Sequence, residues 1–137
     1  MKTLVKKSLT EVSNDYPSIF SSVFGEFVYE GNYPSEIYLG YDDGKLVGFI
    51  AGYTQSPHIW YMQRAGFFKD EQGVFRNFER SLFAINEILN EYPFIMTLIQ
   101  NDDTKALKMA IKLGFKIIGT RMDTVKNLWV EMIRGRE

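Results

Sequence analysis

The segment from Phe94 to Phe115 constrains the fold more than any other part of this 137-residue chain. It begins with the apolar run Phe94 to Ile99, which predicts a buried strand. A polar cluster at 101–104 follows, and its Asn, Asp and Thr side chains are of the kind that accept hydrogen bonds from the first free N–H groups of a helix. The segment therefore predicts a strand that leads directly into a capped helix.

The predicted helix has one apolar side and one charged side. Its apolar residues recur at helical spacing: Ala106, Leu107, Ala110, Ile111 and Leu113. Its lysines, Lys105, Lys108 and Lys112, fall on the side expected to face water. Gly114 follows, and glycine readily takes the left-handed conformation with which many helices end. Two further strands are expected after it, at Phe115–Arg121 and Val125–Ile133.

The residues before Phe94 predict a hairpin with further strands and helices around it. The predicted ranges are a strand at Leu4–Lys7, a mainly helical stretch at Thr10–Val28 broken or restarted at Pro17, strands at Glu36–Tyr41, Leu46–Tyr53 and His58–Phe68, and a helix at Gly73–Tyr92. Within the first helical stretch, apolar residues lie three and four apart: Ile19, Phe20, Val23, Phe24 and Phe27. The pair Asp43-Gly44 between two apolar runs predicts a tight turn in which Gly44 has a positive φ. The order predicts one mixed α/β domain over residues 1–137.

Composition excludes several classes of function. A hydrophobic fraction of 45% excludes a disordered chain, and a formal net charge of −1 favours neither nucleic acid nor an anionic membrane as a partner. The absence of cysteine excludes disulfides and thiolate chemistry, and a single histidine leaves no metal site to expect. The N-terminal residues lack the apolar centre of a signal peptide, and no apolar run approaches the roughly 20 residues of a membrane span. We therefore expect a soluble, cytoplasmic protein.

Residues 101–115 resemble the helix-to-strand segment of the GNAT acyltransferase superfamily, written roughly N-x-x-A-x-x-x-Y-x-x-x-G-F. Ala106, Gly114 and Phe115 match this pattern in register, whereas Asp103 stands at the Asn position and Ala110 at the Tyr position. The predicted order of elements is also that of the family, so the resemblance covers nearly the whole chain. It implies an α/β, GNAT-like single domain: a mixed, mostly antiparallel sheet with helices on both faces and a splayed central pair of strands.

The resemblance implies that acyl-CoA binds at the loop between the long central strand and the next helix. The family's loop usually reads [RQ]-x-x-G-x-[GA]; here Gly73 matches, whereas Asp70 and Phe75 depart from the pattern. Backbone N–H groups at the N-terminus of such a helix face the pyrophosphate. The residues expected to contact acetyl-CoA are Ala65, Phe67, Gln72, Gly73, Val74, Phe75, Arg76, Asn101 and Lys105. The alternative is that Gly73 only begins a helix and Phe75 packs into the core.

Two catalytic positions of the family hold other residue types in this chain. Family members use a Glu on the central strand to take a proton from the amine and a Tyr on the second C-terminal helix to protonate the thiolate. Residues 58–68 contain no carboxylate, and the Tyr position is Ala110. Tyr61 and Gln63 alternate with Ala65 on one face of the strand, so they are the catalytic candidates, with Tyr61 as the substitute acid. His58 at the strand start is more typical of a surface residue.

We therefore predict an acyl-CoA-dependent N-acyltransferase that moves an acetyl group from acetyl-CoA to the amine of a small molecule or peptide, without a metal. The thioester carbonyl would face a backbone N–H near Ala65. One alternative is a GNAT-fold protein that has lost catalysis and serves as a structural or interaction module; another is a module that holds CoA without transferring its acyl group. The acidic pair Asp70-Glu71 and the bulky Phe75 predict weak CoA binding. Because the family's terminal strands often pair across dimers, a homodimer with Trp129 at its contact is also an expectation.

Overall fold

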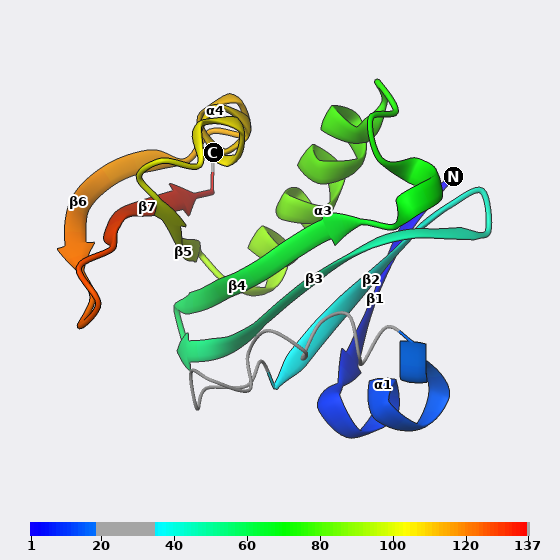
Figure 1. Cartoon of the computed structure of the whole chain (residues 1–137). Helices are drawn as coiled ribbons and strands as arrows, with labels where there is room; N and C mark the ends of the chain where they lie inside the picture. Colours follow the sequence, from blue (N-terminus) through cyan, green and yellow to red (C-terminus); the bar gives the residue numbers. More distant parts are fainter. Residues whose placement is uncertain (19–34, 137) are drawn as a thin grey trace. The chain divides into compact units, whose positions relative to one another are not determined.

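The computed structural model describes residues 1–18 and 35–136 (Figure 1). Its strands are β1 (Lys2–Ser8), β2 (Glu36–Asp42), β3 (Lys45–Ser56), β4 (Ile59–Phe67), β5 (Phe94–Gln100), β6 (Lys116–Met122) and β7 (Leu128–Gly135). Its helices are α1 (Leu9–Asp15), the 3-10 turn η2 (Lys69–Glu71), α3 (Asn77–Glu91) and α4 (Thr104–Lys112). The seven strands form a sheet in the order β1-β2-β3-β4-β5-β7-β6. Within the described ranges, no helix is both long enough and apolar enough to cross a membrane.

The chain divides into two compact units. Unit 1 comprises Met1–Thr54 and Met62–Val74, and unit 2 comprises Gln55–Tyr61 and Phe75–Glu137. Neither unit is a continuous stretch of sequence, because the chain passes from one unit to the other at three points, one of them inside β4.

Unit 1 contains the antiparallel sheet of β1, β2 and β3. A two-residue turn joins β2 to β3, with φ of 51° at Asp43 and 80° at Gly44. Positive φ at both central residues is the requirement of a type I′ turn, so the prediction for Gly44 is confirmed. One face of this sheet carries a core cluster in which α1 takes part: Val12, Ile37, Leu39, Phe49 and Ala51.

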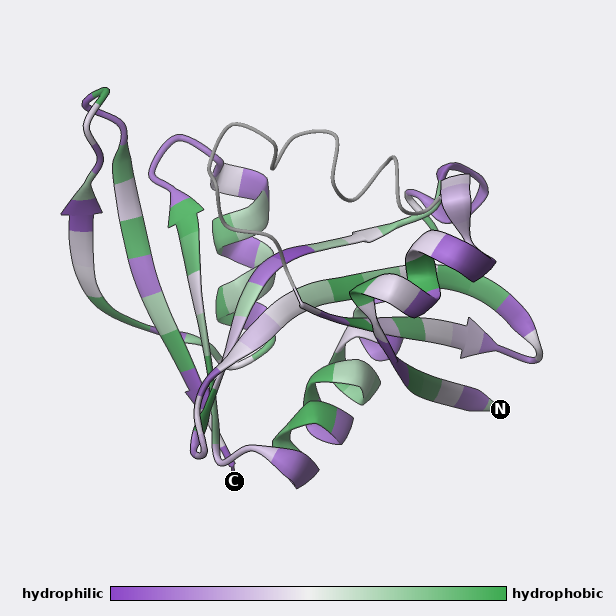
Figure 2. Ribbon diagram, turned by 90° about the horizontal axis from the view of Figure 1, so that it is seen from below, coloured by the Kyte–Doolittle hydropathy of each residue, from purple (hydrophilic) through white to green (hydrophobic). Residues whose placement is uncertain are grey.

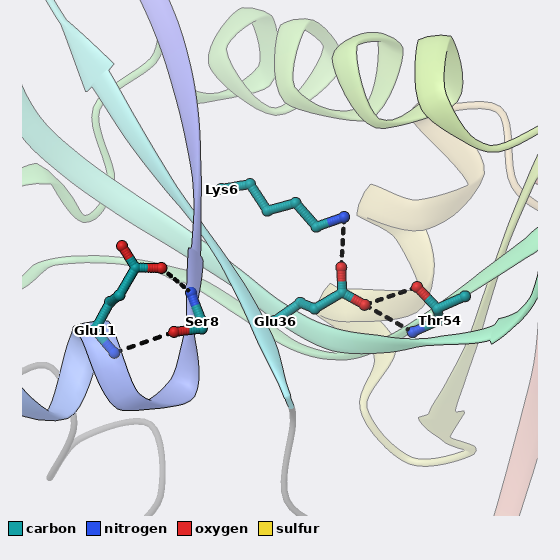
Figure 3. A network of polar contacts seen from close by, with 5 residues as sticks. All are labelled: Lys6, Ser8, Glu11, Glu36 and Thr54. Carbon is teal, nitrogen blue, oxygen red and sulfur yellow. Dashed lines mark hydrogen bonds and ion pairs between the residues drawn. The ribbon is translucent and has the colours of Figure 1, made fainter.

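Helix α1 begins with a capping box and covers the first part of the predicted helical stretch; Pro17 and Ser18 are helical again, as the predicted break or restart at Pro17 requires. The Glu11 backbone N–H donates to Ser8 Oγ at 3.2 Å, and the Ser8 N–H donates to Glu11 Oε1 at 3.0 Å (Figure 3). The helix ends at Asp15, just before Pro17, as the restricted conformation of a residue that precedes proline favours. The predicted apolar face formed by Ile19, Phe20, Val23, Phe24 and Phe27 lies outside the described residues.

A polar network joins β1, β2 and β3 in unit 1 (Figure 3). Glu36 on β2 forms an ion pair with Lys6 on β1 through Oε2. Its other oxygen, Oε1, accepts hydrogen bonds from Thr54 on β3, at 3.0 Å from N and 2.7 Å from Oγ1. Burial by itself raises the pKa of Glu36, but the hydrogen bonds from Lys6 and Thr54 outweigh this effect and lower the pKa below its ordinary value.

Helix α3 in unit 2 begins at Asn77, whereas the sequence predicted a start at Gly73. Gly73 has a φ of +76°, which lies outside the helical range, so the chain turns there before the helix forms. Arg76 occupies the N-cap position, but its side chain makes no capping hydrogen bond. The apolar residues that α3 buries lie on one helical face: Ala84, Ile85, Ile88 and Leu89.

The sheet of unit 2 contains β5, β7 and β6, which pair antiparallel. From Trp129 onward, half-buried and buried residues alternate along β7, and Figure 2 shows that this strand carries both hydrophobic and hydrophilic bands. Phe94 at the start of β5 donates its N–H to the carbonyl of His58, just before β4, at 3.0 Å. The two strands therefore start side by side, as a parallel pair does. Together with the antiparallel pairs, this confirms the predicted mixed α/β class.

Two arginines around the end of β7 bind the C-terminal carbonyls of the helices of unit 2. Arg134 is buried, and its Nε donates to the carbonyl of Leu113, at the end of α4, at 2.9 Å. Arg136 donates to the carbonyls of Leu89 and Asn90 near the end of α3. The last carbonyls of a helix have no partner within it and carry partial negative charge, so both cations stabilise the helix ends.

Gly114 ends α4 in the left-handed conformation, with φ of 93°, as predicted. A Cβ atom on this residue would lie 2.6 Å from Arg134 Nε and 3.1 Å from Arg134 Cδ. The position therefore requires glycine for two reasons, its backbone conformation and the close approach of the buried guanidinium.

Candidate active site

The catalytic candidates lie on β4, at alternate positions. Tyr61 and Gln63 are half-buried and Ala65 is exposed, whereas Trp60, on the opposite parity, is fully buried. Alternation along a strand places Tyr61, Gln63, Ala65 and Phe67 on one face. The Gln63 side-chain oxygen Oε1 is buried and has no hydrogen-bond partner in the part of the chain that the structure describes. A buried amide oxygen without a partner is costly, so it is a position at which a bound N–H group would be stabilised.

The loop after β4 is held in place by three contacts within unit 1. The Phe68 N–H donates to the carbonyl of Val47 at 3.0 Å, and Gln72 Nε2 donates to the carbonyl of Phe67 at 3.2 Å. Glu71 is buried, and its Oε1 lies 2.8 Å from Lys45 Nζ on β3. One of the two acidic side chains that the sequence places in this loop is therefore neutralised by Lys45. The Lys45–Glu71 pair was not foreseen, because no sequence spacing links a hairpin turn to a loop 26 residues later.

Phe75 does not pack into the core, which contradicts the alternative raised for this loop. Its side chain is 96% exposed, in the turn that follows Gly73. Because α3 begins only at Asn77, Phe75 lies outside the helix and is not part of its buried apolar face. The other part of that alternative, that Gly73 begins the helix, is also wrong, since Gly73 has a left-handed conformation and α3 begins only at Asn77.

The first turn of α3 contains a buried polar pair that sequence reasoning missed. Arg80 Nη1 donates to Asn77 Oδ1 at 2.9 Å, and both residues are buried. The spacing of three places the two side chains on one helix face, which is the signal from which the pair could have been found.

At the start of α4, one residue of the polar cluster provides the cap. Asp103 is the N-cap, and its Oδ1 accepts from the Ala106 N–H at 3.1 Å. Asn101 and Lys105 are exposed. Ala110, at the position where the family has Tyr, is buried at 6% exposure and offers no proton.

The structure brings some of the candidates together and leaves others in separate units. Gln63, Ala65, Phe67, Gln72, Gly73 and Val74 belong to unit 1, whereas Tyr61, Phe75, Arg76, Asn101 and Lys105 belong to unit 2. His58 is exposed, and its N–H donates to Ser56 Oγ at 3.3 Å, as expected of a turn residue. Among residues 1–18 and 35–136, no group of three or more His, Asp or Glu side chains is placed to hold a metal ion.

The fold is that of the GNAT acetyltransferases. No protein-family model and no curated protein sequence matches the chain. Similar solved structures include the ribosomal-protein-S18-alanine N-acetyltransferase from Escherichia coli, with 13% identity, a TM-score of 0.68, and coverage of 98% of this chain and 94% of that one. A GNAT family acetyltransferase from Elizabethkingia anophelis with acetyl-CoA bound has 13% identity, a TM-score of 0.67, and coverage of 98% of both chains. The aminoglycoside acetyltransferase AAC(6')-Ib with coenzyme A has 15% identity, a TM-score of 0.67, and coverage of 99% and 95%.

Proposed function

We propose that this protein is an acyl-CoA-dependent N-acyltransferase that transfers an acetyl group from acetyl-CoA to an amine of a small molecule or peptide. The observation that supports this most is the fold, which almost the whole chain shares with acetyltransferases, two of them solved with CoA or acetyl-CoA. The acceptors named for these proteins are an aminoglycoside and the alanine of a ribosomal protein, so an amine is the acceptor group that they share.

In the proposed reaction the amine nitrogen attacks the thioester carbonyl carbon. A C–N bond forms and the C–S bond breaks; the proton that the amine loses passes to solvent water, and the CoA thiolate gains a proton. Gln63 Oε1, buried and without a partner among the described residues, would accept a hydrogen bond from the amine N–H and orient it. Tyr61, two residues earlier on the same face of β4, would supply the proton to the thiolate. A backbone N–H near Ala65 would stabilise the oxyanion.

The loop residues fit acetyl-CoA in part. The backbone N–H groups of Gly73 and Val74, in a left-handed turn before α3, are suited to a pyrophosphate, and Arg76, which follows Val74 by two residues in the sequence, would supply a cation. Lys45 neutralises Glu71, so Asp70 is the acidic side chain that would still oppose the phosphates. We therefore propose weak CoA binding, with Ala65, Phe67, Gln72, Phe75, Asn101 and Lys105 as further contacts.

The test is direct. The purified chain is incubated with radiolabelled acetyl-CoA and a panel of amines that includes kanamycin and a peptide with an N-terminal alanine, and the transfer of label is measured. Replacing Gln63 with Leu removes the proposed acceptor, while Gln63→Glu keeps one. Loss of one hydrogen bond in a buried site costs about 1–3 kcal/mol, so Gln63→Leu should lower kcat/KM roughly 5- to 150-fold and Gln63→Glu should not. Equal rates for the two variants would exclude Gln63 from the reaction.

A non-catalytic GNAT-fold module is the second candidate. Ala110, which has no proton to give, and the absence of a carboxylate on β4 favour it. A thermal-shift measurement with acetyl-CoA separates the candidates, because a ligand that binds the native state raises the melting temperature by mass action. A melting temperature that does not change at millimolar acetyl-CoA, together with no transfer to any amine, would establish the non-catalytic function. The proposed homodimer and the cytoplasmic location stay predictions.

A further inference from the structure

The outer edge of β6 exposes far more apolar surface than the opposite edge of the sheet. β1 and β6 are the two edge strands. On β6 the exposed fractions are 57% for Ile117, 53% for Ile118 and 62% for Met122, whereas on β1 Val5 is the large apolar side chain that is exposed, at 38%. Edge strands carry unpaired N–H and C=O groups, and exposed apolar side chains beside them mark an interaction site.

The pairing register of β6 with β7 sorts its side chains onto two faces. Ile117 pairs with Met132, and Met122 pairs with Leu128. Ile117 and Met122 therefore lie on the same face of the sheet as Met132, whose side chain is fully buried. Directly opposed residues of an antiparallel pair share a face. The register shift between Ile117 and Gly119 leaves Ile118 as an extra residue in the strand. Ile117 and Met122 therefore extend the apolar face of unit 2 to its edge.

The other face of β6 is cationic. Lys116 pairs with Ile133 and Arg121 pairs with Trp129, which places both cations on the face opposite to Ile117. Arg121 Nε lies 3.3 Å from Glu131 Oε1, but its side chain remains 60% exposed. The positive charge extends beyond the strand: residues 104–128 hold six Lys or Arg and one Asp, a formal charge of +5, while the remainder of the chain holds ten Lys or Arg and sixteen Asp or Glu, a formal charge of −6.

We propose that the outer edge of β6 binds an extended, acidic segment of a partner protein, which adds to the sheet as a further strand. The side chains of an added strand alternate between the two faces. Its residues of one parity would contact Ile117 and Met122, and those of the other parity would contact Lys116 and Arg121. The strand that fits is therefore one in which apolar and acidic residues alternate, with main-chain hydrogen bonds providing affinity and the alternation providing specificity.

The same geometry disfavours two other occupants. A second copy paired through its own β6 would bring its Lys116 and Arg121 onto the face where this chain already has two cations, and like charges opposite one another are destabilising. A lipid bilayer needs apolar and basic side chains on the same side of the surface that it contacts. Here they project to opposite faces.

The experiment uses the full chain and fluorescein-labelled octapeptides, with binding measured by fluorescence anisotropy. The first peptide alternates Val and Glu, the second holds the same residues as separate blocks of Val and Glu, and the third alternates Val and Lys. The alternating Val–Glu peptide should bind roughly tenfold tighter than its block isomer, which corresponds to about 1.4 kcal/mol. Equal binding of the two isomers would overturn the proposal, because the edge of β6 would then not distinguish an alternating sequence from a block sequence.

Charge reversal on β6 provides the second readout. The double variant Lys116→Glu and Arg121→Glu should bind the Val–Glu peptide roughly tenfold more weakly and the Val–Lys peptide roughly tenfold more tightly than the wild type does. The matched control reverses Lys108 and Lys112 on α4 and should keep the original preference. An equal loss of Val–Glu peptide binding in both variants would overturn the proposal, since the peptide would then respond to the overall positive charge of this region and not to the two cations of β6.

Two further measurements decide between occupants. Self-association in sedimentation equilibrium that Ile117→Lys abolishes would overturn the proposal in favour of a second copy. Co-sedimentation with phosphatidylserine vesicles that Ile117→Lys or Met122→Lys abolishes would overturn it in favour of a membrane. Since the edge of β6 holds none of the proposed catalytic residues, acetyl transfer should be unchanged by these variants, and failure of either proposal leaves the other standing.

Discussion

Replacing Gly114 with Ala is expected to lower the free energy of unfolding for two separate reasons. The first cause is backbone strain, because Gly114 has a φ of 93° and a left-handed conformation costs an L-residue about 1–2 kcal/mol. The second cause is contact with Arg134, since the new methyl group would lie 2.6 Å from Nε of a side chain that is buried and donates to the Leu113 carbonyl. Displacing that guanidinium breaks a hydrogen bond of a charged group, which is worth about 1.5–3 kcal/mol. Together the two causes predict a loss of about 2.5–5 kcal/mol in the free energy of unfolding.

Gly44→Ala is the matched control. Gly44 also has a positive φ, of 80°, but no heavy atom lies within 4 Å of the position that its Cβ would take. Alanine there should therefore add strain alone, about 1–2 kcal/mol. Urea unfolding at equilibrium measures both variants, and the difference between them isolates the contact with Arg134.

The reasoning would be refuted if Gly114→Ala and Gly44→Ala lowered the free energy of unfolding equally. It also makes a prediction for a double-mutant cycle. In an Arg134→Ala background, Gly114→Ala should cost only the strain, so the two substitutions should be strongly non-additive.

Three other predictions concern Gly48, Glu36 and Tyr61. Gly48→Ala should cost about 1–3 kcal/mol in urea unfolding, because its Cβ would lie 2.6 Å from the Gly66 carbonyl oxygen, whereas Gly40→Ala, with its nearest atom at 3.7 Å, should cost less than half as much. The lowered pKa of Glu36 contributes stability that is present above the ordinary value of 4.5 and is lost as pH falls through the folded value; the stability gap between the wild type and Glu36→Gln should therefore close on acidification, and a gap that stays constant with pH would contradict this. If the protein transfers acetyl groups, Tyr61→Phe should lower kcat by roughly 10²- to 10⁴-fold while Ala110→Ser leaves it unchanged, and an active enzyme indifferent to Tyr61→Phe would exclude Tyr61 as the acid.

Sequence reasoning succeeded where the signal is local. The Asp43-Gly44 turn, the cap of α4 and the left-handed Gly114 each depend on residues that are close together in the chain, and the structure confirms all three. The mixed α/β class also followed from the order of elements. Short-range steric and hydrogen-bond rules decide these features almost independently of the rest of the molecule.

Sequence reasoning failed where distant residues decide the outcome. The start of α3 was placed at Gly73, because a helical pattern reads continuously through a residue whose actual φ is +76°. Whether Phe75 is buried or exposed depends on that boundary. The ion pair of Lys45 with Glu71 joins two segments that no sequence periodicity connects. For the candidate active site, the sequence predicts Tyr61 and Gln63 on one face of β4, but only the structure shows that the Gln63 oxygen is buried without a partner in the described chain.

The arginines around the end of β7 can reach the helix ends of unit 2 only after β7 has been synthesised. Arg134 binds the end of α4 and Arg136 binds the end of α3, yet more than forty residues separate α3 from the second of these cations. A ribosome that has translated both helices but not β7 therefore presents two helices with open C-terminal carbonyls and a β5 strand whose antiparallel partner does not yet exist. Such a nascent chain exposes apolar surface and an unpaired strand edge, the features that recruit chaperones and promote aggregation. A chain that ends before β7 should therefore aggregate more readily than one that contains it.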